Sequence, residues 1–315
     1  MPQLKGEIAI LGAGAMGLGI AQLFAQKNVS VILYDKFQNI LEDALGKIYA
    51  QMNELVKQGF ITEESIEGVL QNIKTTEDLE EVKNSWLVIE AIPEILELKQ
   101  ELLSQLETIC DSTVIFASNT SGLPINMLAE KLEHPERFIG THFFMPAQVV
   151  PLVEVIRNDK TSEQVSNKVM DFFKEIDKKP VLLKKDIPGF IGNRIQHAMA
   201  REAISLLEQG IASAEEIDTV VRWSIGVRML FTGPLEQRDL NGLDVHHHIA
   251  SYLYKDLENR TEPADLLAKK VANSELGIKT GKGFYEWDEN QQKNISQEKN
   301  TKMLQLIHWV NQLEK

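Results

Sequence analysis

Disulfides, basic tracts and repeats are absent from this 315-residue chain. Its single cysteine, Cys110, cannot form an internal disulfide, which is typical of proteins in a reducing cytoplasm. No run of Lys and Arg is interleaved with aromatic residues, and the formal net charge of −13 argues against a nucleic-acid-binding surface. A local basic pocket for an anionic small molecule is compatible with this charge. We therefore expect a soluble, cytoplasmic protein with a small-molecule ligand and no nucleic-acid partner.

One long uncharged stretch, residues 8–25, resembles a short membrane span or the core of a signal peptide. Four glycines, at positions 12, 14, 17 and 19, fall within eight residues of it, which would be unusual in a membrane anchor. A glycine-rich nucleotide-binding turn accounts for them better. We therefore expect no membrane association.

The first 35 residues fit the dinucleotide-binding fingerprint in its required context of strand, glycine turn, helix, strand and acid. A strand at 7–11 precedes the turn, and a second strand at 29–34 follows the helix. In the turn, Gly12 permits a tight bend, Gly14 lets the backbone approach a pyrophosphate, and Gly17 lets helix and strand pack closely. The helix N-terminus offers free N–H groups to phosphates. The predicted cofactor-binding residues here are Gly12, Gly14, Ala15, Met16 and Gly17.

The acid that completes the fingerprint is Asp35, at the end of the second strand. Its carboxylate can accept hydrogen bonds from both hydroxyls of a ribose. Its charge would repel a 2′-phosphate. The sequence therefore predicts NAD rather than NADP as the cofactor.

A carboxylate interrupts an otherwise apolar run, 151–156, which is typical of a buried strand. This residue, Glu154, is costly to bury unless it has a partner. His142 ends another apolar run, 137–142, and twelve residues are enough for the chain to turn back. The two side chains can then act as a general base and the group that orients it. Taken alone, the pair is equally consistent with a structural hydrogen bond.

Two other polar groups follow predicted strands. Glu94 and Lys99 come after the strand at 86–92, and the cluster 118–122 follows the strand at 113–117. Carboxyl ends of parallel strands form the ligand crevice of such sheets, which favours a functional role. The alternative for residues 118–122 is an ordinary turn with local hydrogen bonds.

Strands and helices alternate up to about residue 186, and an almost wholly helical pattern follows. This predicts a Rossmann-type doubly wound α/β domain over 1–186, with a helical insertion at about 38–71, and an all-helical domain over 187–287. Residues 288–315 are predicted to form a polar linker and an amphipathic helix. Helices are expected at 38–59, 62–71, 214–225, 234–257 and 301–313. The three consecutive histidines at 246–248 point in different directions on a helix, so no metal site is expected.

Several segments together resemble the L-3-hydroxyacyl-CoA dehydrogenase family, including its 3-hydroxybutyryl-CoA members. They occur in the family's order between residue 7 and about residue 287. The matching segments are 12–22, 89–94 with Lys99, 118–121, His142-Phe-Phe-Met-Pro146, 152–156, 188–194, 233–236, 242–244 and 279–285.

The resemblance implies an enzyme of fatty acid metabolism that works as a homodimer through its helical domain. His142 would take the proton of the 3-hydroxyl as hydride leaves for NAD, and Glu154 would hold the imidazole. Ser121 and Asn193 would bind the reacting oxygen or the acyl carbonyl. The residues implied to line the NAD site are Asp35, Glu94, Lys99, Asn119 and Lys279.

Two features depart from the family pattern. Met145 stands where the family usually has asparagine, and the segment 149–154 and the tail beyond Trp287 are similar to relatives that oxidise CoA-free 3-hydroxy acids, such as carnitine or gulonate dehydrogenases. A CoA-free 3-hydroxy acid is therefore the alternative substrate. A third alternative, a nucleotide-binding scaffold without catalysis, is disfavoured by the intact set of His142, Glu154, Ser121 and Asn193.

Overall fold

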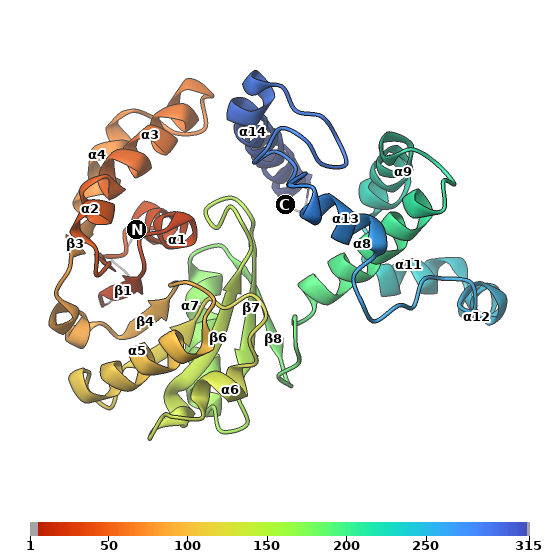
Figure 1. The fold of residues 1–315 in the computed structure, drawn as a ribbon. Helices are drawn as coiled ribbons and strands as arrows, with labels where there is room; N and C mark the ends of the chain where they lie inside the picture. Colours follow the sequence, from red (N-terminus) through yellow and green to blue (C-terminus); the bar gives the residue numbers. More distant parts are fainter. Residues whose placement is uncertain (1–5, 314–315) are drawn as a thin grey trace. The chain divides into compact units, whose positions relative to one another are not determined.

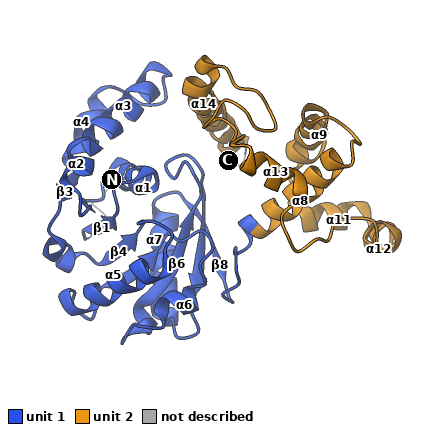
Figure 2. Ribbon diagram, in the orientation of Figure 1, with its two compact units in different colours: residues 1–193 blue, residues 194–315 orange. Residues whose placement is uncertain are grey.

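An eight-stranded sheet organises the first of two units, which ends at Asn193; the second unit begins at Arg194 (Figures 1 and 2). The computed structural model describes residues 6–313. The strand order is β3-β2-β1-β4-β5-β6-β7-β8, and neighbours are parallel except for the antiparallel pair β6–β7. The strands are β1 (Ile8–Leu11), β2 (Val31–Tyr34), β3 (Ile73–Thr76), β4 (Leu87–Glu90), β5 (Ile115–Ser118), β6 (Phe138–Phe143), β7 (Leu152–Arg157) and β8 (Lys179–Leu183).

Helices cover both faces of this sheet, and each face has its own apolar core. One core contains residues of α1 (Ala15–Gln26), α3 (Ala44–Lys57) and α7 (Glu163–Glu175). The other contains residues of α5 (Leu96–Ile109) and α6 (Ile125–Ala129). The predicted doubly wound α/β fold is thereby confirmed.

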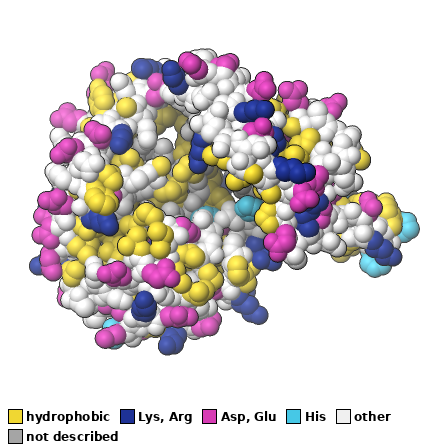
Figure 3. Space-filling model, in the orientation of Figure 1, with side chains coloured by type: hydrophobic (Ala, Val, Ile, Leu, Met, Phe, Trp, Pro, Cys, Tyr) yellow, Lys and Arg dark blue, Asp and Glu magenta, His cyan; other side chains and the backbone are white. Residues whose placement is uncertain are grey.

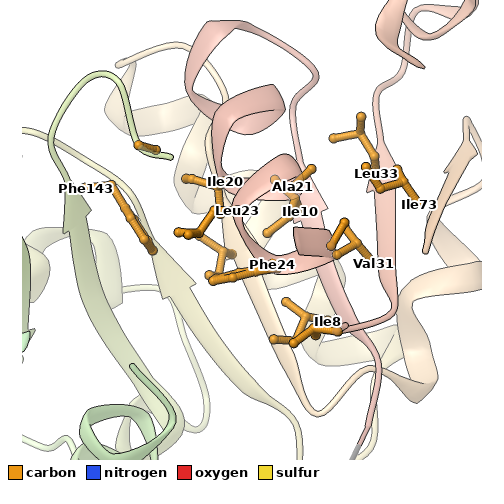
Figure 4. Close-up of a cluster of buried hydrophobic side chains, with 14 of the residues drawn as sticks. Ile8, Ile10, Ile20, Ala21, Leu23, Phe24, Val31, Leu33, Ile73 and Phe143 are labelled. Atoms are coloured by element: carbon orange, nitrogen blue, oxygen red, sulfur yellow. The ribbon is translucent and has the colours of Figure 1, made fainter. Parts of the chain in front are cut away.

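The core under α1 joins the start of the sheet to β6. Figure 4 shows Phe24 of α1 between side chains of β1 and β2 and the ring of Phe143. The rings of Phe24 and Phe143 meet edge to face at 6.2 Å, and Phe143 in turn meets Phe173 of α7 at 5.4 Å. This packing holds the glycine turn and the strand of His142 in one rigid framework.

The insertion after Asp35 differs in detail from the expected helices. The helix expected at 38–59 is divided at Asp43 into α2 (Gln38–Glu42) and α3, and the next helix is α4 (Glu64–Gln71). A one-residue break leaves the apolar spacing almost unchanged, so periodicity did not detect it. The edge strand β3 and the 3₁₀ helix at Leu79–Asn84 were not predicted, because β3 has only one buried residue, Ile73.

The second unit is helical, as predicted. Its helical segments, including the helix that leads into it, are α8 (Gly192–Glu208), α9 (Ala214–Val220), a π-helical turn (Val221–Gly226), α10 (Val227–Met229), α11 (Pro234–Asn241), α12 (Leu243–Leu253), α13 (Asp265–Ala272) and α14 (Glu289–Leu313). The helix expected at 234–257 breaks at Gly242, whose φ of +93° ends α11.

The last helix is longer than the sequence indicated. It begins at Glu289, so residues expected to form a polar linker are helical. Its start carries a reciprocal cap: the Gln291 N–H donates to the Asp288 carboxylate (2.8 Å), and the Asp288 N–H donates to the Gln291 side chain (3.0 Å). This Asp-x-x-Gln pattern is a capping box and was the signal that could have located the helix start.

The surface mixes charged side chains of both signs over the displayed face, with no large basic area (Figure 3). Within residues 6–313, no helix is both long and apolar enough to cross a membrane. Among the described residues of the second unit, the buried apolar side chains are only Ile217 and Ala264. Large apolar side chains of this unit are instead exposed, including Trp223 and Leu235.

Candidate active site

The glycine turn lies at the carboxyl end of β1 and has the geometry expected of a dinucleotide site. Gly12 has φ +104°, and a Cβ on it would lie 2.8 Å from the carbonyl oxygen of Ala91. A Cβ on Gly17 would collide with the carbonyl oxygen of Gly12, so only glycine allows the helix to approach the strand. Gly14 caps α1 without a side-chain hydrogen bond and has open space around it.

The N-cap residue therefore offers no side chain to accept hydrogen bonds from the backbone N–H groups of the first turn of α1, which includes Ala15 and Met16. Unsatisfied N–H groups and the helix dipole make such an N-terminus a site for phosphate. The residues present fit the pyrophosphate of a dinucleotide.

Asp35 lies directly beyond β2 and next to this turn. Its carboxylate accepts hydrogen bonds from the backbone N–H groups of Ala13 (2.9 Å) and Phe37 (3.0 Å). These two bonds fix the carboxylate beside the glycine turn. Asp35 is only half-buried, so part of its carboxylate stays accessible to a ligand. That accessible part matches the expected contact with a ribose.

His142 and Glu154 meet across the antiparallel ladder of β6 and β7, where they are register partners. The His142 Nδ1 atom lies 2.7 Å from Glu154 Oε2, and both side chains are buried. The imidazole packs against the rings of Phe144 (4.5 Å between centroids) and Phe190 (5.6 Å). The structure thus brings together the two residues that the sequence pairs.

The second carboxylate oxygen of Glu154 is also used. It accepts the backbone N–H groups of Ile191 and Gly192, each at 2.9 Å. Burial raises the pKa of the Glu154 carboxyl, but the hydrogen bonds from His142 and these two N–H groups outweigh it and hold the pKa below its usual value. Glu154 is therefore ionised at neutral pH. It fixes a proton on His142 Nδ1, which leaves Nε2 as the nitrogen that can accept a proton.

Asn193 follows directly after the two residues that bind Glu154, and its side chain contacts Ser121. The Asn193 side-chain amide donates to the Ser121 carbonyl oxygen (2.8 Å), one residue after the Gly192 N–H donates to Glu154. Asn119 accepts the backbone N–H of Phe143 (3.0 Å), the residue that follows His142. Direct hydrogen bonds thus link the polar cluster after β5 to β6 and to the 188–193 segment, and link that segment to Glu154 of β7.

Glu94 and Lys99 belong to one network at the carboxyl end of β4, in which Lys99 is buried and Glu94 is exposed. The Lys99 ammonium donates to Glu90 Oε1 (2.5 Å) and the Ile92 carbonyl oxygen (3.1 Å), and it lies 3.2 Å from Glu94 Oε2. Because an ammonium has three protons, these three acceptors account for all of them. Lys99 is 1% exposed, so it is not accessible to a ligand directly. Its ammonium instead holds the Glu94 carboxylate, which is exposed.

Glu94 in turn holds the polar cluster after β5. Its Oε1 accepts the Thr120 hydroxyl (2.6 Å), the Ser121 N–H (2.8 Å) and the Ser121 hydroxyl (3.2 Å). Burial raises the pKa of Glu94, but the bond from Thr120 and the nearby Lys99 charge hold it below its usual value. An ionised Glu94 thus orients the Ser121 hydroxyl at the strand ends.

Glu90 is a residue that the sequence reasoning did not select. It is fully buried on β4, where it binds Lys99 and accepts the Ser118 hydroxyl (2.6 Å) and the Ile92 N–H (2.7 Å). The signal was available, because Glu90 interrupts the apolar run 86–92 just as Glu154 interrupts its own. Lys279 lies apart from these residues in sequence, in an exposed turn of the second unit between Gly277 and Lys282.

The glycine turn at the end of β1, the carboxylate of Asp35 beside it and the buried His–Glu pair lie on one Rossmann-type sheet, an arrangement typical of NAD-dependent dehydrogenases. The chain belongs to the 3-hydroxyacyl-CoA dehydrogenase family: residues 7–187 match the model of the NAD-binding domain and residues 189–287 that of the C-terminal domain. Its enzyme class is therefore an NAD-dependent oxidoreductase of the 3-hydroxyacyl-CoA dehydrogenase type.

Individual relatives differ in substrate. A 5-formyl-3-hydroxy-2-methylpyridine 4-carboxylate 5-dehydrogenase of Mesorhizobium japonicum is 34% identical over 299 residues, which are 95% of this chain and 96% of that protein. A probable 3-hydroxybutyryl-CoA dehydrogenase of Bacillus subtilis is 38% identical over 284 residues, 90% of this chain and 98% of that protein. A crystal structure of a 5-dehydrogenase of the first kind, described as an NAD+-dependent dismutase, has a TM-score of 0.89 and 33% identity over 97% of this chain and 98% of its own.

Proposed function

We propose that this protein oxidises the 3-hydroxyl of an L-3-hydroxyacyl-CoA to the 3-keto group, reversibly, with His142 as the general base. The observation that carries the proposal is the buried His142 Nδ1–Glu154 Oε2 contact of 2.7 Å, built on the sheet that bears the dinucleotide turn. A base held in one tautomer by an ionised acid is the arrangement that proton abstraction from an alcohol requires.

In this proposal, His142 Nε2 accepts the proton of the 3-hydroxyl, and the imidazolium that forms is stabilised by Glu154. The carboxylate does not take the proton, because its three hydrogen bonds hold its pKa below the usual value. In the reverse direction the imidazolium returns the proton to the oxygen. Phe144 and Phe190 shield the ring from water on the sides that they cover.

When bound, NAD would supply the acceptor for the hydride that leaves C3 of the substrate. The chain's part is to bind and orient this cofactor. We assign pyrophosphate binding to the N-terminus of α1 with Gly12, Gly14, Ala15, Met16 and Gly17, and ribose binding to Asp35. Glu94, Asn119 and Lys279 are proposed to complete the cofactor site, with Lys99 acting through Glu94.

Ser121 and Asn193 are proposed to bind the reacting oxygen or the acyl carbonyl. Their direct link, from the Asn193 amide to the Ser121 carbonyl oxygen, supports a shared role. Glu94 accepts a hydrogen bond from the Ser121 hydroxyl, so the lone pairs of the Ser121 oxygen remain to accept a hydrogen bond from the 3-hydroxyl of the substrate. The Asn193 amide has a second N–H, which can donate to the reacting oxygen or the acyl carbonyl.

The test is NADH oxidation by the purified protein with acetoacetyl-CoA. Turnover supports the proposal, and its complete absence at millimolar substrate contradicts the CoA assignment. The helical segment 38–71 is the proposed CoA-binding element, so replacing Lys47 and Lys57 together by Met should raise the KM for acetoacetyl-CoA. An unchanged KM would remove that segment from the proposal.

A second candidate is a dehydrogenase of a small, CoA-free hydroxy acid or aldehyde acid. It is favoured by the relative from Mesorhizobium japonicum, whose alignment covers 95% of this chain and so extends beyond residue 287, where the family model ends. Met145, 64% exposed, also replaces the usual asparagine near His142. A panel of carnitine, gulonate, 3-hydroxybutyrate and a pyridine aldehyde carboxylate with NAD discriminates the two candidates, because only the second predicts turnover without CoA.

We also propose that the protein is a homodimer through its second unit. Trp223, Leu235 and Leu240 on this unit are 71%, 82% and 67% exposed, and exposed apolar side chains in such number mark a surface that is covered in solution. Light scattering on the purified protein tests this. A monomer mass at micromolar concentration would contradict it.

A further inference from the structure

The loop between the two strands of the His–Glu pair, residues 144–151, has a buried anchor. It leaves β6 two residues after His142 and enters β7 two residues before Glu154. It also carries Met145, the residue that departs from the family pattern. The position of this loop therefore influences both the base and the surface beside it.

Lys178 is that anchor. It lies between α7 and β8 and is 7% exposed, which is unusual for a lysine. Its ammonium donates to the carbonyl oxygens of Ala147 (2.6 Å) and Val150 (2.7 Å). Burial, together with the nearby charge of Lys27, lowers the pKa of Lys178 to about 7. A lysine is buried at such a cost only where its hydrogen bonds are needed.

The far side of the loop is pressed against the cofactor-binding helix. A Cβ on Gly19 of α1 would lie 3.4 Å from the Ala147 Cβ and 2.7 Å from Gln148 Oε1. Ala147 is itself buried. Gly19 follows the last glycine of the dinucleotide turn by two residues, so the loop packs against α1 close to that turn.

Backbone hydrogen bonds also hold the loop, in addition to the bonds from Lys178. Within the loop, the backbone N–H groups of Val149 and Val150 both donate to the Pro146 carbonyl oxygen at 3.0 Å. Lys178 then fixes the carbonyl of Val150, and the Lys179 N–H donates to the Pro151 carbonyl oxygen (2.9 Å). Without the Lys178 amine, the carbonyls of Ala147 and Val150 would lose both hydrogen bonds, and the loop would lose the attachment that they provide.

We propose that Lys178 is a positioning residue: by fixing the 144–151 loop against α1, it sets the distance and angle between the substrate, His142 and the nicotinamide. This inference rests on the proposed dehydrogenase function. Lys178 touches neither substrate nor cofactor in it. A displacement of the reacting groups by about 1 Å can cost on the order of 100-fold in rate, so a loose loop is expected to slow hydride transfer far more than it weakens cofactor binding.

The experiment compares Lys178→Met, which keeps an unbranched stem one atom shorter but removes the donors, with Lys174→Met, which removes an exposed lysine of α7. For each folded variant, kcat and KM are measured with the substrate that the wild type turns over. The dissociation constant of NADH is measured separately by fluorescence. We expect Lys178→Met to lower kcat by roughly 10–100-fold with nearly unchanged NADH affinity, and Lys174→Met to behave as the wild type.

A conservative variant separates positioning from general stability. Lys178→Arg keeps the charge and the donors, so it should recover most of the kcat, whereas Lys178→Gln, which is too short to reach both carbonyls, should resemble Lys178→Met. If Lys178→Met does not fold, the comparison of Arg with Gln decides. Wild-type kcat in folded Lys178→Met or Lys178→Gln would overturn the inference, as would an equal loss of kcat and NADH affinity. If the wild type turns over no substrate of the panel, the proposed function fails first, and this inference falls with it.

Discussion

His142 and Glu154 are direct register partners in the β6–β7 ladder, and their side chains meet on one face of the sheet at 2.7 Å. Residues opposite each other in an antiparallel pair always project to the same face. A slip of one residue would move Glu154 to the other face and break the pair. The β6–β7 ladder therefore sets the geometry of the proposed base.

Glu154→Gln should disable catalysis while preserving the fold. The amide keeps the shape and can still accept the N–H groups of Ile191 and Gly192, but it loses the charge that stabilises a protonated His142. We expect kcat to fall by about 10²–10⁴, as when a positioned acid–base group is removed, and His142→Ala to fall within the same range. Steady-state kinetics with the active substrate provide the measurement. Glu163→Gln, at an exposed position of α7, is the matched control. Activity that survives in His142→Ala would show that another group is the base.

Asp35→Ser should relax the preference for NAD over NADP. The substitution removes the charge that repels a 2′-phosphate, while the serine hydroxyl can still accept one of the two backbone N–H groups now bound by the carboxylate. The measurement is the ratio of kcat/KM for the two cofactors. Asp159→Ser, at an exposed acid between β7 and α7, serves as the control. Unchanged selectivity would mean that a different group reads the ribose.

Sequence predicts well those parts of this molecule in which a residue pattern follows from a single physical requirement. The glycines at 12 and 17 are required by a positive φ and a helix–strand contact, and both constraints are visible in the order of residues. Glu154 was found because a carboxylate in an apolar run needs a partner. Glu90 has the same signature, but its partner Lys99 lies nine residues away on a helix, and a helical lysine gives no sign that it is buried.

Other features depend on tertiary contacts that no local pattern encodes. The hydrogen bonds from Ile191 and Gly192 to Glu154 join segments 37 and 38 residues apart. Asn193 was therefore indicated only by family resemblance, not by its spacing. The breaks at Asp43 and Gly242 interrupt helices without disturbing the apolar period, and β3 is an edge strand with little apolar content.

Lys99→Met should strongly destabilise the first unit, because it leaves Glu90 buried without its cationic partner. Breaking a buried ion pair from one side typically costs about 3–5 kcal/mol. The double variant Glu90→Gln/Lys99→Met removes both charges and should be more stable than the sum of the two single variants predicts. Urea unfolding at neutral pH measures all four free energies. Additive effects would indicate that the two side chains stabilise the fold independently.

The stability that the Glu154 carboxylate provides should be lost at acidic pH. Its pKa in the folded protein lies below the value of about 4.3 expected for an unfolded chain. The folded state therefore binds this proton less readily than the unfolded state, so the contribution is fully present above the unfolded pKa and is lost as the pH falls through the folded pKa. Relative to Glu154→Gln, the wild type should keep its excess of melting temperature from neutral pH down to mildly acidic pH. Below a pH of about 4.3 that excess should shrink. Thermal unfolding followed by circular dichroism at a series of pH values measures it, with Glu163→Gln as the control for general acid effects. A difference between wild type and Glu154→Gln that grows as the pH falls below about 4.3 would mean that the carboxyl is protonated, not ionised, in the folded protein.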